Sequence, residues 1–289
     1  MKHIFIINPT SGTGKYKILE DWLLTQNNLD YEVFYTEYVG HAQELAHSFG
    51  KDVVIYAVGG DGTAHEVLNG IHPEATMGMI PTGTGNDFVK AFGRKTSLLQ
   101  TIEDTVLHGE TRKIDVGSMN DKLFLNVTNL GIDANINERA NNTREGLMPR
   151  KFVYLISALK EVFKIKPYPI RVKKDGRMMD ASIALLCVMN GMYYGGGFKA
   201  APLSVIDDGY LDLCMVDAIS LSRALVLLPK YMRGKHMEEE EVRYEKIKRI
   251  EIESGVPLMV GCDGEIFKTT SIKIEVKKHY LNLRAPKNA

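Results

Sequence analysis

The stretch AVGGDGTAHEVLNG, residues 57 to 70, decides the fold. It begins inside a run of apolar residues, 53 to 58, and this run stops at two glycines and Asp61. A helical pattern follows, whose apolar face carries Ala64, Val67, Leu68 and Ile71. A continuously apolar strand is typical of a parallel sheet that helices cover on both faces. The stretch therefore predicts a strand, a glycine turn and a helix, the repeating unit of an α/β domain.

The same alternation extends over the first 110 residues. Short apolar runs predict strands at 4–7, 32–36, 53–58 and 76–80. Apolar residues at helical spacing predict helices over 18–23, 42–49 and 98–106, and Gly109 ends the last of them. We therefore expect a Rossmann-like α/β domain with a parallel sheet and helices on both faces.

From about residue 112 the pattern changes to short β-like segments that Gly, Asp and Pro separate. These segments lie at 122–128, 170–174, 181–189, 210–216, 246–253 and 271–276. They predict a mainly antiparallel second domain, either a β-sandwich or an open barrel. One helix is expected at 150–166. Its lysines would suit a membrane interface, although packing on its own sheet is the commoner role of such a helix.

We place the domain boundary near residue 118. The first domain then comprises 1–118 together with 280–289, because the strand expected at 280–284 can return to the first sheet. The second domain comprises 119–279.

Composition excludes several classes of protein. The 289 residues carry no formal net charge, so no basic field indicates a nucleic-acid partner. Three cysteines, Cys187, Cys214 and Cys262, form no CxxC or Cys/His cluster, which argues against a disulfide scaffold or a zinc site and suits a reducing cytosol. No stretch reaches the ~18 consecutive apolar residues of a membrane span. The N-terminus is interpreted as a first strand, not a signal peptide, so we expect a cytoplasmic protein.

Three glycine-rich loops follow predicted strands: NPTSGTGK at 8–15, GGDGT at 59–63 and PTGTGNDF at 81–88. Ligands of open α/β sheets bind at the carboxyl ends of the strands. Glycine allows backbone N–H groups to approach an anion closely, and helix N-termini favour negative charge. The first loop is not a Walker A motif, because Lys15 is followed by Tyr16 and not by Ser or Thr. Lys15 either reaches a phosphate or is simply solvated.

Asp61 is unexpected in a phosphate loop, because like charges repel. An aspartate beside a nucleotide can hold a cation through water or accept a proton from a hydroxyl. The alternative is that Asp61 is only a helix N-cap. Capping alone does not call for the flanking glycines Gly59, Gly60 and Gly62.

GGDGT followed by PTGTGNDF resembles the diacylglycerol kinase catalytic-domain family, the bacterial lipid kinases related to sphingosine kinases. Further matching pieces occur in order over nearly the whole chain. They are NPTSG at 8–12, Thr36 ahead of GHAQELA, RKIDVG at 112–117, FLNVTNLGIDA at 124–134, MNGMYYGGGFKAAPLSVIDDGYLD at 189–212, GKH at 234–236 and DGE at 263–265. NAD kinases share GGDGT, and phosphofructokinases do so loosely. PTGTGNDF and the segment ending at 212 are specific to the lipid branch.

The resemblance implies a two-domain kinase that binds ATP in the cleft between its domains, with the first domain as the nucleotide-binding one. The nucleotide site would be lined by residues of the three loops and their neighbours: Asn8, Pro9, Thr10, Ser11, Gly12, Lys15, Thr36, Gly59, Gly60, Asp61, Gly62, Thr63, Glu66, Gly83, Thr84 and Asn86.

The resemblance also implies a magnesium site and a catalytic base. A structural Mg²⁺ would be held by Asp208 and the backbone carbonyls of Val205 and Tyr210, with Asp115 and Asp61 in an acidic network joined through water. Glu265 matches the position usually assigned as proton acceptor, with Asp263 beside it, while Asp61 is the rival base by analogy with the sphingosine kinases. From the residues alone, Asp-Gly at 263–264 predicts a plain hairpin turn.

These implications define an expected function. The chain would be an ATP- and Mg²⁺-dependent lipid kinase, with diacylglycerol as the default acceptor and other lipid alcohols still open. It would take its substrate at the inner face of the membrane as a peripheral protein, and a homodimer is plausible for the family. The substrate could be bound by an apolar lining of Met189, Met192, Tyr193, Tyr194 and Phe198. The alternatives are an NAD kinase-like enzyme with a soluble acceptor and a non-catalytic nucleotide or lipid sensor.

Overall fold

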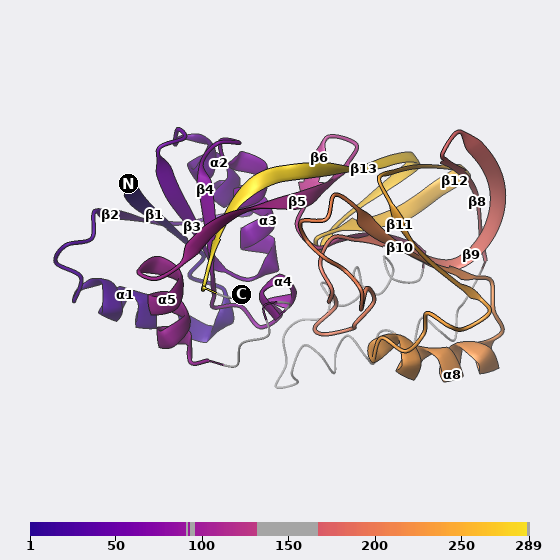
Figure 1. Cartoon of the computed structure of the whole chain (residues 1–289), viewed down its shortest axis with the longest axis horizontal. Helices are drawn as coiled ribbons and strands as arrows, with labels where there is room; N and C mark the ends of the chain where they lie inside the picture. Colours follow the sequence, from indigo (N-terminus) through magenta and orange to yellow (C-terminus); the bar gives the residue numbers. More distant parts are fainter. Residues whose placement is uncertain (91, 93–95, 132–166, 288–289) are drawn as a thin grey trace. The chain divides into compact units, whose positions relative to one another are not determined.

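The computed structural model describes residues 1–90, 92, 96–131 and 167–287, and these ranges form two compact units. One unit comprises Met1–Asp115 and His279–Ala289, and the other comprises Val116–Lys278 (Figure 1). The helix expected at 150–166 and the last three residues of FLNVTNLGIDA lie outside the described residues.

A parallel sheet forms the centre of the N-terminal unit. It contains β1 (Lys2–Ile7), β2 (Tyr31–Tyr35), β3 (Val53–Gly59), β4 (Thr76–Pro81) and the end of β13 (Glu265–Ala285). The strand order is β13-β4-β3-β1-β2, and each neighbouring pair in this unit is parallel. The last strand joins through residues 282–284, where Asn282 is in register with Thr76. Five chain segments thus direct their carboxyl ends to one edge of the sheet.

Helices cover this sheet on both faces. They are the 3₁₀ turn η1 (Gly12–Gly14), α1 (Lys17–Leu23), α2 (His41–His47), α3 (Asp61–Gly70), α4 (Asp87–Lys90) and α5 (Leu98–Val106). Alternate strand residues such as Phe5 and Tyr56 pack with Trp22 of α1 and Ile102 of α5 in one core cluster. The residues between them, such as Ile55, are also buried and point to the opposite face, as strand geometry requires. The strand, glycine turn and helix predicted for 53–70 are confirmed.

Antiparallel strands dominate the C-terminal unit. They are β6 (Lys122–Phe124), β7 (Val127–Gly131), β8 (Tyr168–Lys174), β9 (Arg177–Met189), β10 (Leu211–Asp217), β11 (Val242–Ile247), β12 (Arg249–Cys262) and the start of β13, while β5 (Glu110–Met119) pairs with β6 and β13. The order is β11-β10-β9-β7-β12-β13, and β8 also pairs with both β9 and β12. The predicted mainly antiparallel second domain is therefore confirmed.

Two core clusters fill the C-terminal unit. One contains Phe124, Leu186, Val260 and Ile274 from the strands. The other contains Cys187, Cys214 and Tyr194 from the opposite face of these strands and their loops, with Leu227 and Tyr231 of α8 (Leu221–Met232). Because β-strand side chains alternate, one strand such as β9 supplies both clusters. Within the described residues, no helix is long and apolar enough to span a membrane.

Candidate functional site

The three glycine loops meet at the carboxyl edge of the parallel sheet. The strands β1, β3 and β4 end in register, with Ile7 opposite Val58 and Gly59 opposite Pro81. A Cβ atom added to Gly12 would lie 1.6 Å from the carbonyl oxygen of Thr82, and one added to Gly83 would lie 2.5 Å from the Cα of Gly60. Because such distances are far below van der Waals contact, only glycine allows the loops to pack backbone against backbone. The loops form one continuous backbone surface.

Asn8 links the first loop to the second. Its backbone N–H donates to the carbonyl of Val58 over 2.9 Å, and its side-chain Nδ2 donates to Thr63 Oγ1 over 3.2 Å. Its Oδ1 accepts from both the N–H and the hydroxyl of Thr10 at 3.0 and 2.8 Å. The turn after β1 is therefore fixed against the start of α3.

Asp61 links the second loop to the third. It is the first residue of α3 and follows the N-cap residue Gly60, so Asp61 is not the helix cap that the alternative interpretation required. Its Oδ1 accepts from the backbone N–H of Asp87 over 2.9 Å, and its Oδ2 lies 2.7 Å from where a Cβ on Gly85 would stand. The carboxylate thus contacts the PTGTGND turn.

Three more predicted residues shape the same edge. Asn86, at a φ of 51°, donates through Nδ2 to the carbonyl of Gly83 over 2.7 Å and closes the third loop. Thr36 donates its N–H to the carbonyl of Ile7 over 2.9 Å. Glu66 accepts from the N–H of Ala42 over 3.1 Å and so holds the N-terminus of α2. These contacts are structural, and any contact with a nucleotide stays a prediction for all three residues.

Sequence reasoning missed Thr82, which lies inside the PTGTGNDF motif. Its side chain is fully buried, and its hydroxyl has no hydrogen-bond partner among the described residues. The PTGTGNDF motif could have pointed to Thr82, because the residues on either side of Thr82, Pro81 and Gly83, take part in the loop contacts. Its carbonyl oxygen is the group that Gly12 packs against.

Asp115 is fully buried in the N-terminal unit. Its Oδ1 accepts from the backbone N–H of His279 over 2.7 Å, and His279 adopts a positive φ of 50°. The observed role of this carboxylate is to join β5 to the returning strand β13. Asp61 and Asp115 belong to the N-terminal unit, whereas the remaining predicted carboxylates belong to the C-terminal one.

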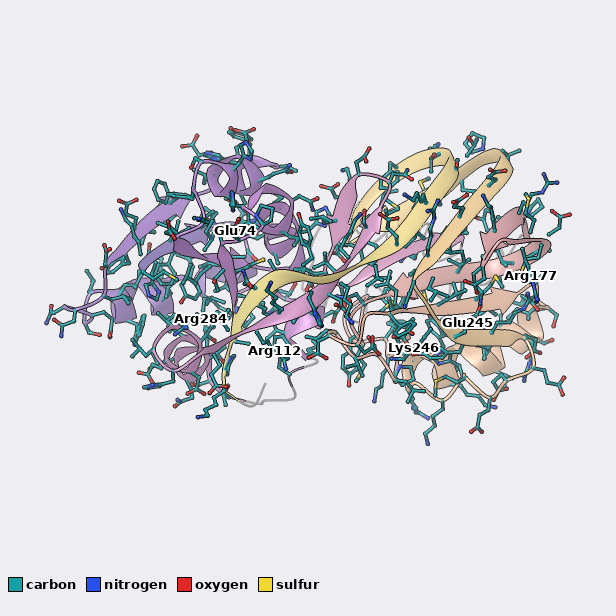
Figure 2. The ribbon with its side chains drawn as sticks, turned by 45° about the horizontal axis from the view of Figure 1, so that its top comes forward. Glu74, Arg112, Arg177, Glu245, Lys246 and Arg284 are labelled. Atoms are coloured by element: carbon teal, nitrogen blue, oxygen red, sulfur yellow. The ribbon has the colours of Figure 1, made fainter. Side chains whose placement is uncertain are left out.

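Asp208 lies in the segment before β10. Its Oδ1 accepts from the N–H of Tyr210 over 3.0 Å, and its Oδ2 is paired with the ammonium of Lys246 on β11. Figure 2 labels Lys246 beside Glu245, the neighbouring residue on this strand, whose carboxylate pairs instead with Lys174. Alternation along β11 thus directs the two side chains to different partners.

The donor set at Asp208 fits Mg²⁺ in kind. The carboxylate already attracts a cation, the Lys246 ammonium, and the expected carbonyls of Val205 and Tyr210 would add hard oxygen ligands. Within the described residues, no group of three or more His, Cys, Asp or Glu side chains has metal-binding geometry. A magnesium ion here would therefore need backbone carbonyls and water besides the one carboxylate, and Lys246 would have to yield its place.

Asp212, four residues beyond Asp208, is a second carboxyl that sequence reasoning did not single out. It is buried, and its Oδ1 accepts from the hydroxyl of Tyr244 over 2.8 Å. Burial raises the pKa of Asp212 above its usual range, and burial likewise raises the pKa of Tyr244. The pair anchors the start of β10 next to β11.

Asp263 and Glu265 flank the hairpin turn between β12 and β13. Asp263 and Gly264 both have positive φ values, 44° and 97°, so the plain turn predicted from Asp-Gly is confirmed. The Asp263 carboxylate accepts three backbone N–H groups, from Leu125 over 2.6 Å, Asn126 over 3.0 Å and Val127 over 2.9 Å. This carboxylate holds the chain between β6 and β7.

The Glu265 carboxylate contacts a lysine side chain. Its Oε2 pairs with the ammonium of Lys122 at 2.5 Å, and 41% of its side chain is exposed. Lys122 also lies 5.9 Å from the ring centroid of Phe267. Asp263 and Glu265 are both partly exposed, but the Asp263 oxygens are occupied by three backbone N–H groups, whereas Glu265 pairs with a half-exposed lysine. Next to them, burial raises the pKa of Cys262 well above its usual range, which keeps that thiol protonated.

The expected apolar substrate lining is partly wrong. Met189, Tyr194 and Phe198 are buried in the core cluster with Cys187 and α8, at 5% exposure or less. The Tyr194 hydroxyl lies 3.1 Å from that of Tyr231. These side chains pack their own domain, because the glycines that follow Tyr194 turn the chain back onto the strands.

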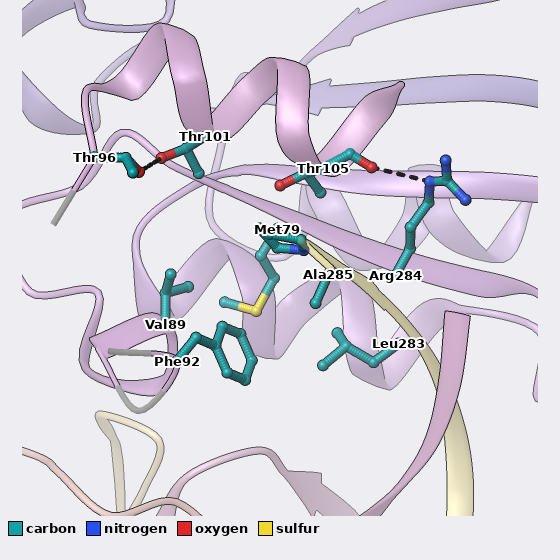
Figure 3. Close-up of a pocket in the computed structure, with 10 residues that line it drawn as sticks. Met79, Val89, Phe92, Thr96, Thr101, Thr105, Leu283, Arg284 and Ala285 are labelled. Atoms are coloured by element: carbon teal, nitrogen blue, oxygen red, sulfur yellow. Dashed lines mark hydrogen bonds between the residues drawn. The ribbon is translucent and has the colours of Figure 1, made fainter. Parts of the chain in front are cut away.

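A small pocket in the N-terminal unit lies beside the third loop (Figure 3). Its apolar lining includes Met79, Val89, Phe92 and Leu283. Three threonines line the side formed by α5 and the residues before it, and Thr96 and Thr101 join their hydroxyls over 3.0 Å. Arg284 donates through Nε to the carbonyl of Thr105 over 3.0 Å at its edge. These residues pack the end of β13 against α5. None of the described lining residues is an aspartate or glutamate that could act at the three glycine loops.

Comparison with known proteins identifies the family. Residues 2–119 match the family model described as the diacylglycerol kinase catalytic domain, and residues 126–285 match the model described as the YegS C-terminal NAD kinase beta sandwich-like domain. The chain belongs to the diacylglycerol kinase catalytic-domain family, and the resemblance found in the sequence is confirmed.

Individual relatives agree with this assignment. The chain is 32% identical over 270 residues to a diacylglycerol kinase of Staphylococcus saprophyticus, a match that covers 90% of this chain and 87% of the relative. It is 29% identical over 273 residues to a diacylglycerol kinase of Bacillus subtilis, with 90% and 88% covered. A solved structure described as a diacylglycerol kinase of Bacillus anthracis shares the fold, with a TM-score of 0.75, 23% identity and coverage of 99% and 97%.

Proposed function

We propose that this protein is an ATP- and Mg²⁺-dependent lipid kinase that phosphorylates diacylglycerol to phosphatidic acid. Its family membership and its relatives named diacylglycerol kinase support the kinase class and a nucleotide phosphoryl donor. The observation that carries the proposal is the meeting of three glycine loops at one sheet edge, with Asp61 bonded across two of them. Whether the donor meets the acceptor between the two domains stays a prediction from the sequence.

The loops provide the binding half of the reaction. Phosphoryl transfer depends mainly on positioning and on stabilising charge, because little covalent chemistry falls to the protein. The backbone packing at Gly12 and Gly83 fixes the loops, so that their N–H groups can meet the phosphates without reorganisation. Gly62, where an added Cβ would meet open space, offers a surface that a phosphate can approach.

Carboxylates provide the other half. Asp208 and the carbonyls of Val205 and Tyr210 would hold the structural Mg²⁺, and Mg²⁺ that accompanies ATP would supply charge neutralisation at the phosphates. We assign Glu265 as the group that accepts the proton of the lipid hydroxyl, because 41% of its side chain is exposed and it stands at the position usually assigned this role in the family. Asp263 is then a positioning residue, since its oxygens hold residues 125–127. Asp61 remains the rival base.

A second candidate is an NAD kinase-like enzyme with a soluble acceptor. The C-terminal family model is described by its likeness to an NAD kinase β-sandwich, and GGDGT is common to both families. The rest of the lipid-branch motifs argue for the lipid acceptor.

One assay separates these candidates. ATP labelled in its γ-phosphoryl group is incubated with the protein and Mg²⁺, and with diacylglycerol in mixed micelles, NAD⁺ or no acceptor. We expect label in an organic-extractable product. Label in a water-soluble NAD product supports the second candidate, and nucleotide binding without transfer indicates a sensor.

The Asp61→Asn variant tests the site in the same assay. Asparagine keeps an oxygen for the Asp87 N–H but removes the charge, so we expect normal folding and a loss of turnover of about 10²–10⁴-fold. Asp30→Asn, at an exposed position of the same unit, is the matched control. Equal turnover by both variants would remove Asp61 from the site.

A further inference from the structure

Helix α8 has too few polar residues for a helix at a protein surface. Only Ser222, Arg223 and Lys230 of its twelve residues are polar. Arg223 donates to Glu241 through Nε over 2.6 Å and to Glu239 over 2.7 Å, and Lys230 pairs with Glu239 as well. Because these ion pairs confine the cations of α8 to one edge, the rest of the helix surface is apolar.

Two apolar faces result. Ala224, Leu227 and Tyr231, spaced three and four residues apart, pack into the core cluster under the helix. Figure 1 shows α8 along the outer side of the strands of its own unit. The outward face carries Leu221, Leu225 and Val226, which are 39%, 40% and 51% exposed. A helix that is apolar on two opposite faces is ordinarily covered on both, and within the described residues the outward face has no apolar partner.

Cationic side chains gather where α8 ends. Arg233 and Lys235 are exposed, and Lys199 adjoins them because its N–H donates to the carbonyl of Met232 over 3.3 Å. Among the described residues none of the three has an ion-pair partner within 4 Å, in contrast to Arg223 and Lys230. Leu203, 57% exposed, follows on the neighbouring loop, where Pro202 packs beside Gly234.

We propose that the outward face of α8, with the Lys199, Arg233 and Lys235 cluster at its end, docks on an anionic lipid bilayer. Exposed leucine and valine side chains insert into the boundary between headgroups and acyl chains, and the cations meet lipid phosphates. This inference rests on the proposed function in one respect: a diacylglycerol acceptor is held in a bilayer, and the enzyme must meet it there.

Charge favours a bilayer over a second copy of the chain. A two-fold interface through this face would take both copies of the cationic cluster out of water, and unpaired charges are costly to bury. An anionic surface satisfies the same cations. The exposed carboxylates of Glu238 and Glu240 follow in the chain and weaken the attraction, so the docking is reversible and sensitive to salt.

The test measures sedimentation of the full chain with vesicles of phosphatidylcholine, with or without phosphatidylglycerol. We expect Arg233→Gln/Lys235→Gln to reduce binding to the anionic vesicles about tenfold or more, and Leu225→Gln/Val226→Gln to reduce it comparably. The matched controls, Met178→Gln/Met179→Gln and Arg177→Gln/Lys268→Gln, replace exposed residues elsewhere in the unit and should bind like wild type. Far-ultraviolet circular dichroism and thermal unfolding verify that each variant is folded.

Equal binding of the α8 variants and wild type would overturn the inference. So would a concentration-dependent dimer that Leu225→Gln/Val226→Gln converts to monomer, because the occupant would then be a second copy. Turnover of short-chain diacylglycerol in detergent micelles should not change in the α8 variants. If wild type binds vesicles through α8 but phosphorylates no lipid, the proposed function fails while the docking surface stands.

Discussion

At the residue scale, the carboxylates of Asp263 and Glu265 lie only two positions apart in the sequence but make different kinds of contact. Asp263 binds three successive backbone N–H groups, whereas Glu265 pairs with one exposed lysine. A hydrogen bond to a charged group contributes more to stability than an exposed ion pair does. The first carboxylate therefore stabilises the unit, whereas the second, to which we assign the catalytic role, contributes little to stability.

This contrast predicts opposite effects of two substitutions. Glu265→Gln should reduce turnover by about 10²–10⁴-fold while its unfolding free energy changes by less than about 0.5 kcal/mol. Asp263→Ala should lower the unfolding free energy by about 2–4 kcal/mol, because three N–H groups lose their acceptor. Urea unfolding and the labelled-ATP assay measure the two quantities. A stable Asp263→Ala variant, or a Glu265→Gln variant of undiminished turnover, would contradict this division of roles.

At the element scale, the position of a glycine within a loop decides what it contributes. Gly12 adopts a φ of 66° and packs against a carbonyl oxygen, whereas Gly62 lies in α3 and faces open space. The first glycine is needed by the protein itself, and the second only by a ligand that approaches the helix.

Alanine at these two positions should separate folding from binding. Gly12→Ala should lose more than about 2 kcal/mol of unfolding free energy, because the added methyl group overlaps the Thr82 carbonyl in a conformation that alanine avoids. Gly62→Ala should be neutral or gain up to about 1 kcal/mol as a better helix former, yet bind ATP more weakly. Thermal unfolding and ATP titration provide the measurements. Full ATP affinity in Gly62→Ala would mean that no phosphate approaches this turn.

The ion pairs of the single element α8 make the stability of the folded protein depend on pH. The hydrogen bond from Arg223 lowers the pKa of Glu241 from 4.5 to about 2. A carboxyl whose pKa is depressed in the folded state stabilises it above the unfolded value, and this contribution disappears as the pH falls from about 4.5 to about 2. We expect Arg223→Met to flatten the pH dependence of the urea midpoint in this window. Lys51→Gln, which removes an exposed pair 3.8 Å apart, should leave the curve unchanged.

At the scale of the whole molecule, the chain completes its first sheet last. Residues 282–284 of β13 pair with β4, and Arg284 donates to the carbonyls of Thr105 and Val106 at the end of α5. Leu281 and Leu283 are buried there. The N-terminal unit therefore depends on residues that follow the whole of the C-terminal unit in the sequence.

Truncation tests this dependence. A chain that ends at residue 278 should be insoluble or lack the cooperative unfolding of the N-terminal unit, because the edge of β4 and its apolar contacts are exposed. A chain that ends at residue 286 loses, among the described residues, the exposed ion pair between Lys287 and Glu110 and should unfold like wild type. Soluble yield and calorimetry distinguish the two. A soluble, cooperatively folded 278-residue chain would show that β13 is dispensable to the unit.

The sequence by itself determined what depends on neighbouring residues. Apolar spacing predicted the strand and helix around Asp61, and Asp-Gly predicted the hairpin before Glu265. The ordered motifs were sufficient to identify the family. Periodicity and turn chemistry act over a few residues, so a linear sequence displays them directly.

Only the tertiary structure decided which partner each polar group has. Asp61 bonds the N–H of Asp87, Asp263 bonds residues 125–127, and Asp115 bonds His279, which is 164 positions away. It also placed Tyr194 and Phe198 in the core, where the sequence had suggested a lipid lining. Such contacts join residues far apart in the chain through sheet register and loop packing. No local pattern encodes them, because each depends on where two separate elements come to lie together.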